Sequence, residues 1–319
     1  MPDALKNLFD DLDLDGLRVS RPTKFIFLCG GKIGENPKVP VSLRHYLLLE
    51  RKIEPRIKAQ VILADKANQL YRDTAYKDLI SFEEDIALIS ASVMVITESA
   101  GSLAELGAFT ANQVTRPHVS IISQTEFSQT ESFVRYGPIE RVKRDDEERV
   151  AFIPWRINGK GLVIKSSVSG HVGNIVSFVN DTVAKVAAEE LYSHVKPMHK
   201  FINILWLLHN CTAMSVMQIQ SYKKTIFGSD LTINEIKNIL YCMKFAGWVD
   251  SYEYLNKTYW YTIYGDDPFS KYKYRQGVQE VNTILRKIDV AKQVKNDLGH
   301  PAHVVQHVSA SKLKPNVIA

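Results

Sequence analysis

The stretch that most constrains how this chain folds is residues 93–112, with the sequence VMVITESAGSLAELGAFTAN. Its first four residues form a short apolar run, which is typical of a buried strand. Small polar residues then make a turn, after which Ser102 is placed to cap a helix that begins at Leu103, with Glu105 at the third helical position. In an open parallel α/β sheet, ligands bind where a strand leads into a helix N-terminus, and that helix end favours an anion.

Glu105 therefore has two interpretations. In the first, its carboxylate only completes the helix cap and complements the helix dipole. In the second, it stands at the mouth of a sugar-phosphate pocket, where it can attack an anomeric carbon. The residues alone leave both interpretations open.

Strand and helix patterns alternate along the first part of the chain. Further strands are expected at 24–29, 60–63, 119–122 and 150–155, and helices at 42–52, 79–89 and 171–192. Residues 132–139 are expected to form a Tyr-Gly-Pro turn over the sheet edge. The alternation predicts an α/β, Rossmann-like fold, in which helices cover both faces of a parallel sheet.

Three positions at the expected strand ends are site candidates. Gly30 and Gly31 directly follow the first strand, where they either bring backbone close to a ligand or make a tight turn. Asp65 lies just past the second strand, where a helix cap is an equally good explanation for a carboxylate. The glycines lack the G-x-G-x-x-G spacing of a dinucleotide fingerprint, and the sequence contains no Walker lysine motif.

After residue 196 the pattern changes to three helices followed by two aromatic strands. The helices are expected at 198–208, 216–226 and 233–246, and the strands at 248–254 and 258–264. This is the order of a winged helix, in which the third helix reads nucleic acid. On that helix and on the wing, the candidate nucleic-acid contacts are Lys237, Asn238, Tyr241, Lys244 and Lys257. A winged helix that binds only protein is the alternative.

The expected domains are an N-terminal arm (1–22), the α/β domain (23–195), the winged helix (196–275) and a C-terminal helix and tail (276–319). In the last domain a helix is expected at 276–298, and 299–319, with three histidines, is expected to be a flexible tail. Residues 196–319 contain 16 Lys/Arg and 9 Asp/Glu, a net charge of +7, whereas the first 195 residues carry −2. A basic second part suggests an acidic partner such as nucleic acid, and a solvated basic face is the alternative.

The remaining composition narrows the cellular setting. The three cysteines are far apart and lack metal-ligand spacing, so we expect a reducing cytoplasm and no metal. No apolar run approaches the roughly 20 residues that span a bilayer. The first 20 residues are acidic and lack the apolar segment of a secretory signal. A cytoplasmic location without a membrane partner is therefore expected.

FLCGG at 27–31, ITESAGSLAELGAF at 96–109 and SFVRYGP at 132–138 resemble bacterial retron effector toxins. In this class a nucleoside 2-deoxyribosyltransferase-like domain precedes a winged helix, and the resemblance covers residues 23–264. It implies that Glu105 attacks C1′ of a sugar as the base leaves. It also implies a second carboxyl group, Glu84 or Asp65, that protonates the base or orients the sugar. The implied pocket is lined by Cys29, Gly30, Gly31, Ser99, Gly101, Ser102 and Tyr136.

One position departs from the transferase pattern. Where these transferases have an aspartate that holds sugar hydroxyls, this chain has Ser99 beside Glu98. The departure favours a phosphate-bearing ligand, so we expect cleavage of the N-glycosidic bond of a nucleotide. NAD is the favoured substrate, and ADP-ribosyl transfer to a macromolecule is a close variant. No cofactor is expected, because a nucleotide or NAD would be the substrate.

The resemblance implies partners as well. It predicts control by a retron reverse transcriptase and its multicopy single-stranded DNA (msDNA, an RNA–DNA hybrid), which the basic winged helix would contact through phosphates. It also predicts a homo-oligomer in which a neighbouring subunit completes the pocket. The alternative function is a nucleotide-sensing winged-helix regulator that binds DNA without catalysis.

Overall fold

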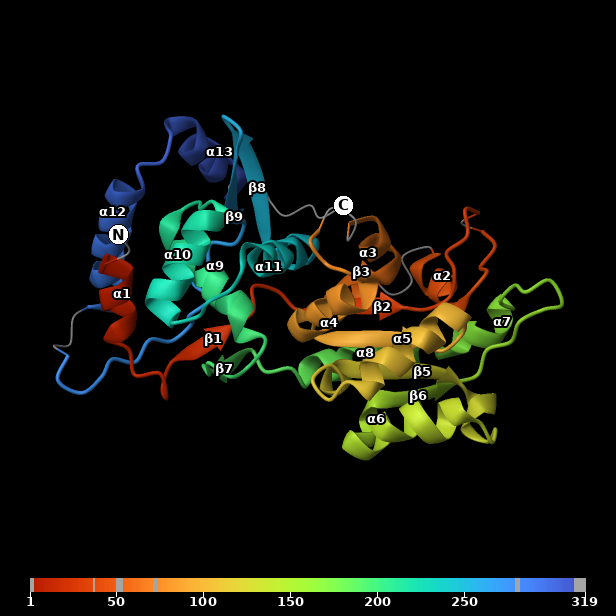
Figure 1. Ribbon diagram of the computed structural model, residues 1–319. Helices are drawn as coiled ribbons and strands as arrows, with labels where there is room; N and C mark the ends of the chain where they lie inside the picture. Colours follow the sequence, from red (N-terminus) through yellow and green to blue (C-terminus); the bar gives the residue numbers. More distant parts are fainter. Residues whose placement is uncertain (1–2, 37, 50–53, 71–73, 279–281, 313–319) are drawn as a thin grey trace. The chain divides into compact units, whose positions relative to one another are not determined.

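A computed structural model describes residues 3–36, 38–49, 54–70, 74–278 and 282–312 (Figure 1). The chain divides into two compact units, each made from separate stretches of sequence. The first, which we call the α/β unit, contains Thr23–Tyr71 and Asp78–Ala187. The second, which we call the helical unit, contains Met1–Pro22, Arg72–Lys77 and Ala188–Ala319.

A five-stranded parallel sheet with the order β3-β2-β4-β5-β6 forms the centre of the α/β unit. The strands are β2 (Phe25–Cys29), β3 (Gln60–Leu63), β4 (Ser92–Ile96), β5 (Val119–Gln124) and β6 (Val150–Ile153). Every neighbouring pair is parallel, with Phe27 opposite Ile62 on one side and Val93 on the other. The prediction of a parallel α/β sheet from strand–helix alternation is confirmed.

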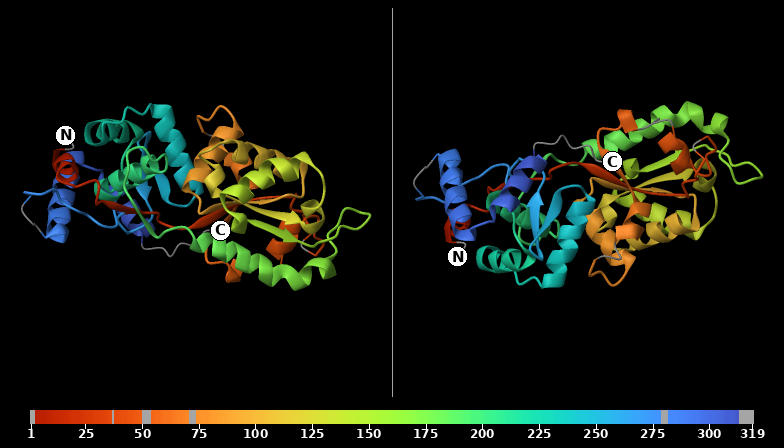
Figure 2. Two further views of the ribbon diagram at one scale, coloured as in Figure 1. Left: turned by 90° about the horizontal axis from the view of Figure 1, so that it is seen from below. Right: turned by 90° about the horizontal axis from the view of Figure 1, so that it is seen from above.

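Helices cover both faces of this sheet, as the two views in Figure 2 show. They are α2 (Leu43–Leu48), α3 (Ala64–Leu70), α4 (Leu79–Ile89), α5 (Ala100–Ala111), α6 (Glu140–Asp145), α7 (Lys165–Val168) and α8 (Val172–Ala184). Alternate residues of a strand point to opposite faces. Ile26 and Leu28 of β2 accordingly pack in one core cluster with residues of α2 and α8. Phe27 and Cys29, at the intervening positions, are fully buried and belong to the opposite face.

Two expected elements of the α/β unit differ in the structure. Residues 132–139 were expected as a turn, but Arg135–Ile139 (η6) is a π-helical turn that continues into α6. The helix expected at 171–192 ends at Ala184. Residues Glu189–Leu191 instead form strand β7 of the helical unit, which pairs antiparallel with β1 (Arg18–Ser20). At Glu189–Leu191 the pairing with β1 therefore determines the structure, although the sequence pattern predicted a helix.

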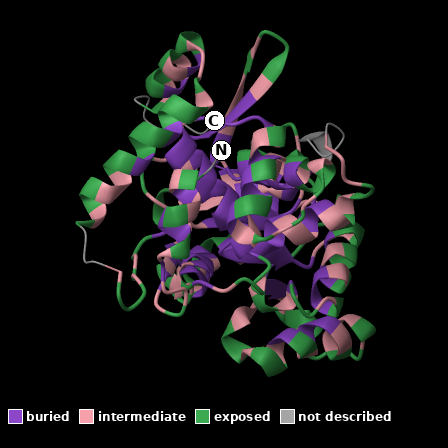
Figure 3. Ribbon diagram, turned by 60° about the vertical axis from the view of Figure 1, so that its left-hand side comes forward, coloured by how far each residue is buried: buried purple, intermediate pink, exposed green. Residues whose placement is uncertain are grey.

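The helical unit contains α9 (His199–Cys211), α10 (Val216–Phe227) and α11 (Ile233–Phe245), followed by the hairpin β8 (Val249–Tyr254) and β9 (Lys257–Thr262). The two-residue hairpin loop, Leu255 and Asn256, has φ of 48° and 59°, as a type I′ turn requires. Helix α9 is buried on nearly every side, which explains its almost continuous apolar sequence. Figure 3 shows how the buried residues gather on the inner surfaces of the elements.

The C-terminal segment expected to be a flexible tail is helical over Ala302–Lys312 (α13). Val304 and Val308 pack against Tyr259 and Tyr261 of the hairpin, and His307 stacks on Tyr252 at 4.0 Å. The histidines therefore pack against aromatic rings, which the sequence pattern alone did not indicate. Before α13, helix α12 spans Thr283–Leu298 and is capped by Asn282.

Two short stretches from earlier in the chain also belong to the helical unit. Residues 1–22, expected as a separate arm, include α1 (Asp3–Asp10), whose Phe9 contacts the rings of Trp206 and Phe227. Residues 74–77, which lie between α3 and α4 in sequence, contact α11: the Ala75 N–H donates to Asn238 Oδ1 at 3.0 Å. The hydroxyl of Tyr76 lies 3.0 Å from Cys242 Sγ.

Candidate active site

The candidate site lies at the carboxyl ends of β2 and β4 in the α/β unit. Strand β2 is flanked by β3 and β4, so the connections leaving β2 and β3 run to opposite sides. In doubly wound sheets of this order, such a switch point opens the crevice in which ligands bind. Cys29 is the last residue of β2, Glu98 follows β4, and Asp65 is in the first turn of α3 after β3. The sheet thus brings residues distant in sequence to one edge.

Helix α5 begins earlier than the sequence pattern indicated. Ser99, not Ser102, is its N-cap, and the two serines form a reciprocal capping box. The Ser99 hydroxyl also lies 3.3 Å from the Gly30 carbonyl oxygen, to which it donates. Because the cap is complete without it, Glu105 belongs to the second turn of the helix. The interpretation of Glu105 as a capping residue is therefore wrong.

Glu98 holds the loop after β2 against helix α2. Its carboxylate accepts hydrogen bonds from the backbone N–H groups of Gly31, at 2.9 Å, of Arg44, at 3.0 Å, and of Leu43. Burial raises the pKa of Glu98, and these three N–H groups oppose that shift. The Glu98 carboxylate therefore holds the backbone of the loop after β2 and of the start of α2 in place.

The two glycines after β2 are explained by packing within the chain. A Cβ atom on Gly31 would lie 2.6 Å from Ser42 Cβ and 3.0 Å from the Glu98 carboxyl carbon. One on Gly30 would lie 3.1 Å from Arg44. Contacts this short would force neighbouring atoms to move. Glycine at these two positions therefore leaves room for the side chains of Ser42, Arg44 and Glu98. This packing explains the two glycines, and their role in bringing backbone close to a ligand stays a prediction.

Arg44 is the residue of this site that sequence reasoning missed. Its side chain is only 2% exposed, and its guanidinium donates to the Gly31 carbonyl at 2.7 Å and to Asp65 at 2.6 Å. A buried cation at the strand ends provides a fixed positive charge for an anionic ligand. Asp65, predicted as a catalytic acid, is the salt-bridge partner of Arg44 and its side chain is 57% exposed. The only sequence signal for Arg44 was a charged residue within an apolar helix pattern.

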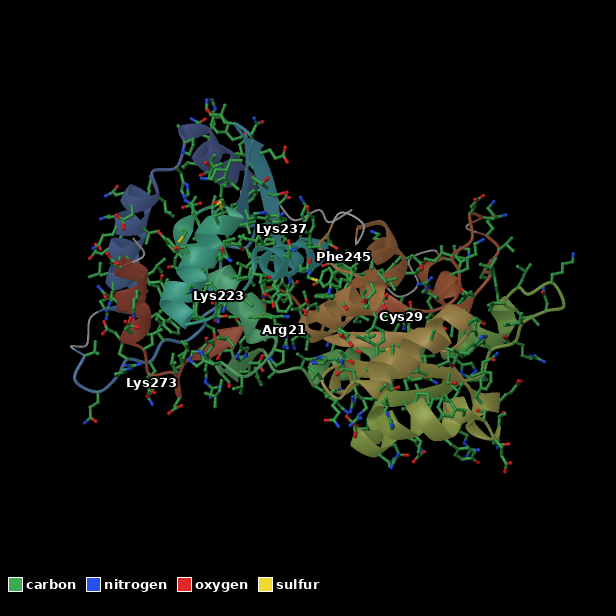
Figure 4. The ribbon with its side chains drawn as sticks, in the orientation of Figure 1. Arg21, Cys29, Lys223, Lys237, Phe245 and Lys273 are labelled. Carbon is green, nitrogen blue, oxygen red and sulfur yellow. The ribbon has the colours of Figure 1, made fainter. Side chains whose placement is uncertain are left out.

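Glu105 is half-buried and faces Cys29 and Arg44. Burial raises the pKa of its carboxyl group and the charge of Asp65 adds to this, whereas a hydrogen bond from the Cys29 thiol and the charge of Arg44 lower it. The pKa of the Cys29 thiol lies well above its usual range because of burial and the nearby Glu105 and Glu83. Cys29 (labelled in Figure 4) is therefore a thiol donor to Glu105 and not a nucleophile.

The second carboxyl group beside Glu105 is Glu83, not the predicted Glu84. The side chain of Glu84 accepts a hydrogen bond from Asn112 Nδ2 at 2.8 Å. Glu83, one residue earlier on α4, is only 7% exposed. Burial and then the charge of Glu105 raise its pKa to about 8. At neutral pH Glu83 is therefore protonated while it faces a second carboxyl group, an arrangement found in acid–base pairs. Two adjacent glutamates in the middle of α4 gave no sequence signal to choose between them.

The other predicted pocket residues occupy different environments. Ser102 is buried and bonded within the cap, and Gly101 is exposed at the first turn of α5. Tyr136 lies on η6, where its side chain is 56% exposed and the Arg135 guanidinium lies 5.0 Å from its ring. A π-helical turn with an exposed aromatic residue is common near functional sites.

The predicted nucleic-acid contacts do not all face solvent. Asn238 is bonded to Ala75, and Tyr241 packs edge-to-face on Trp260. Lys244 forms an ion pair with Asp250 at 2.8 Å. Lys237 (labelled in Figure 4) and Lys257 are exposed.

Among the described residues, no cluster of three or more His, Cys, Asp or Glu side chains could hold a metal ion. No helix in the described part of the chain is long and apolar enough to cross a membrane.

The chain is similar to known proteins of bacterial retrons. A family model described as STM3845 retron effector protein matches residues 40–251. The chain is 26% identical over 136 residues to an Escherichia coli protein named "Retron Ec73 putative ribosyltransferase/DNA-binding protein", a match that covers 42% of each. It is also 26% identical over 125 residues to the E. coli "Retron Ec86 putative ribosyltransferase/DNA-binding protein", covering 39% of each. The matches span less than half the length of these relatives.

Proposed function

The chain belongs to the STM3845 retron effector family, and from this premise we propose that it is an antiphage effector that cleaves the N-glycosidic bond of a nucleotide. NAD is the favoured substrate. The names of the two E. coli relatives, which describe a ribosyltransferase, support chemistry at the anomeric carbon of a ribosyl group. The reaction takes place in the α/β unit.

The observation that carries this proposal is the pair of carboxyl groups, Glu105 and Glu83, in unlike environments. Burial raises the pKa of Glu105, and the Cys29 thiol and the Arg44 cation oppose this rise by favouring the ionised form. Glu83 keeps its proton up to a pH of about 8. One carboxylate and one carboxylic acid side by side are what glycosidic bond cleavage requires.

The chemical steps follow from these protonation states. Glu105 attacks C1′, forming a carboxylate–C1′ bond as the bond from C1′ to the base nitrogen breaks and its electron pair leaves with the base. A purine base leaves with the Glu83 proton. Nicotinamide needs no proton, because its nitrogen is positively charged in NAD, and Glu83 then donates a hydrogen bond to the sugar. Attack by water at C1′ breaks the carboxylate–C1′ bond, releases one proton to solvent and restores the Glu105 carboxylate. With NAD, attack by a macromolecular nucleophile breaks the same bond, also with loss of a proton, and gives ADP-ribosyl transfer.

The helical unit suggests a nucleic-acid partner. Three helices followed by a hairpin are the order of a winged helix, and exposed Lys237 and Lys257 would contact phosphates of the msDNA held by the retron reverse transcriptase. A homo-oligomer and a cytoplasmic location belong to the same proposal. A nucleotide-sensing DNA-binding regulator is the second candidate, favoured by the words "DNA-binding protein" in the names of both relatives.

The deciding experiment incubates the purified full-length chain with NAD and a panel of ribo- and deoxyribonucleotides and identifies the products by mass. Glu105→Gln keeps the shape and removes the charge, so we expect at least a hundredfold loss of base release. Glu84→Gln, on the same helix as Glu83, is the matched control and should retain activity. Product formation by Glu105→Gln at the wild-type rate would exclude the proposed chemistry, and a DNA footprint without any product would favour the regulator.

Glu83→Gln then distinguishes the classes of substrate. If the natural leaving group is a purine, removal of the Glu83 proton should lower the rate of base release by about 10²–10⁴-fold. If it is nicotinamide, the loss should be close to that of one hydrogen bond, about tenfold.

A further inference from the structure

Residues 74–77 lie on the surface of helix α11. In sequence they connect α3 to α4, two helices of the α/β unit, but they belong to the helical unit. The Ala75 N–H donates to Asn238 Oδ1 at 3.0 Å, and the Tyr76 hydroxyl lies 3.0 Å from Cys242 Sγ. Both partners are on α11, four residues apart, so the two contacts fall on neighbouring positions of one helix surface.

These contacts involve the side of α11 that faces away from its own core. Ile236, Leu240 and Met243 are buried at spacings of four and three residues, which is the pattern of a helix face packed against a core. Asn238 is two residues from both Ile236 and Leu240, so at about 100° per residue it points roughly 160° away from them. We call the side opposite this buried stripe the outer α11 face; its residues are Asn234, Asn238 and Tyr241.

A helix that reads duplex DNA presents this same side to the bases. In a winged helix the third helix lies in the major groove, and its buried stripe packs on the rest of the domain. The major groove is about 12 Å wide and a helix with its side chains is about 10–12 Å across, so the groove has no room for a second layer of chain. Helix α11 therefore cannot enter a major groove while residues 74–77 lie on its outer face.

The contacts that residues 74–77 make with α11 can be replaced by contacts with DNA. Thr74, Ala75 and Tyr76 are each partly exposed. The Asn238 side-chain amide, which accepts from the Ala75 N–H, is also the group that pairs with the edge of an adenine in the major groove. Asn238 can thus exchange one partner for the other, so loss of the Ala75 contact leaves no buried polar group unpaired.

We propose that residues 74–77 and duplex DNA compete for the outer α11 face, so that the chain binds duplex DNA weakly until this segment leaves the helix. Lys237 and Lys257 are exposed while the segment is in place, and they supply the phosphate contacts of the weak state. This inference rests on the proposed function, because the role of α11 in nucleic-acid binding is taken from it.

The first test measures the binding of full-length protein to a fluorescein-labelled DNA duplex by anisotropy at a fixed salt concentration. Tyr76→Phe removes the hydroxyl and keeps the ring, and Ala75→Pro removes the N–H that Asn238 accepts. We expect each variant to bind the duplex about 2- to 10-fold more tightly, because each loses a contact that keeps the outer α11 face covered. Tyr192→Phe, which removes a hydroxyl that contacts His194 in the same unit, is the matched control and should leave duplex affinity unchanged.

The second test follows the segment itself by hydrogen exchange with and without the duplex. We expect the Ala75 amide to exchange faster in the complex, because DNA has taken its acceptor, while peptides from α11 exchange more slowly. A duplex that binds elsewhere on the surface would leave exchange at residues 74–77 unchanged or slow it. The direction of the change therefore distinguishes competition from simple binding.

The outcomes separate this inference from the proposed function. Unchanged or weaker duplex affinity in both folded variants, or unchanged or slower exchange at residues 74–77 in the complex, overturns the inference. Absence of duplex binding in the wild type and in both variants overturns it too, and base release that depends on Glu105 then leaves the proposed chemistry standing. Tighter binding by both variants, in a chain that releases no base from any nucleotide, supports the inference and contradicts the glycosidase alone.

Discussion

Replacing Glu83 by glutamine should stabilise the α/β unit at neutral pH, and the gain should depend on pH. The pKa of Glu83 rises from 4.5 to about 8 in the folded chain, because of burial and then the charge of Glu105. Between these pH values the folded chain binds one proton more than the unfolded chain. The stabilising contribution of Glu83 is therefore fully present below about pH 4.5 and is lost as the pH rises through 8.

The size of the free-energy gain follows from how far the pH lies above 4.5, the ordinary pKa of a glutamate. Each pH unit corresponds to about 1.4 kcal/mol, so the two and a half units between 4.5 and 7 cost about 3 kcal/mol. Glutamine has a similar shape and does not ionise, so Glu83→Gln should avoid this cost. The expected gain over wild type is smallest at pH 5, is about 3 kcal/mol at pH 7 and is largest at pH 8. Glu105→Gln in the same chain should reduce the gain, since one cause of the shift disappears.

The assay is urea unfolding at pH 5, 6, 7 and 8, followed by hydrogen exchange of peptides from β2 and β4, which report on the α/β unit by itself. Glu84→Gln is the control for loss of a charge from α4. An equal gain for Glu83→Gln at pH 5 and pH 8 would refute the reasoning. A pH-dependent gain of the same size in Glu84→Gln would refute it as well.

Further predictions concern the loop, the buried cation, the pH profile and the helical unit. Gly31→Ala should destabilise the α/β unit by about 1–3 kcal/mol in urea unfolding, because the new Cβ meets atoms at 2.6 and 3.0 Å, whereas Gly101→Ala, with no neighbour nearer than 3.9 Å, should cost far less. Arg44→Met should cost about 1–3 kcal/mol by the same measurement, since it leaves the Gly31 carbonyl unpaired. With a purine nucleotide, kcat/KM should fall as the pH passes about 8, where Glu83 loses its proton, and a flat profile would contradict this role. Lys237→Gln should weaken msDNA binding and reduce the salt slope of log Kd by about 1, as filter binding at several salt concentrations can measure.

The strand pattern of the α/β unit was readable from sequence because each buried strand is a continuous apolar run between polar turns. The runs at 60–63 and 79–89 match β3 and α4 to the residue. Helix starts were harder to predict. Ser99 and Ser102 both suit an N-cap, and only the three-dimensional turn selects Ser99, whose hydroxyl also reaches the Gly30 carbonyl on the neighbouring strand.

The candidate site was predictable in part for a related reason. Glu105 was predicted to follow a strand and a Gly-Ser turn at the edge of the sheet, and it does lie on the helix after β4, beside Cys29. The choice between Glu83 and Glu84 depends on which face of α4 points to the sheet, which adjacent identical residues do not reveal. Arg44 is paired with Asp65, 21 residues away, a contact that only the sheet order creates. The α13 helix was missed because its apolar positions are few and its partners lie on the hairpin.

The division of the chain into interleaved stretches has a consequence for how the protein is made. All of the α/β unit has been synthesised once Ala187 is added, so it can fold as a domain while the ribosome is still producing the rest. Residues 1–22 and 74–77 cannot form their contacts at that stage, because Val19 pairs with Glu190 and Ala75 pairs with Asn238. Helix α1 and the residues before α4 thus remain without their partners until later parts of the helical unit have emerged, so the α/β unit is complete before the unit that we expect to meet nucleic acid.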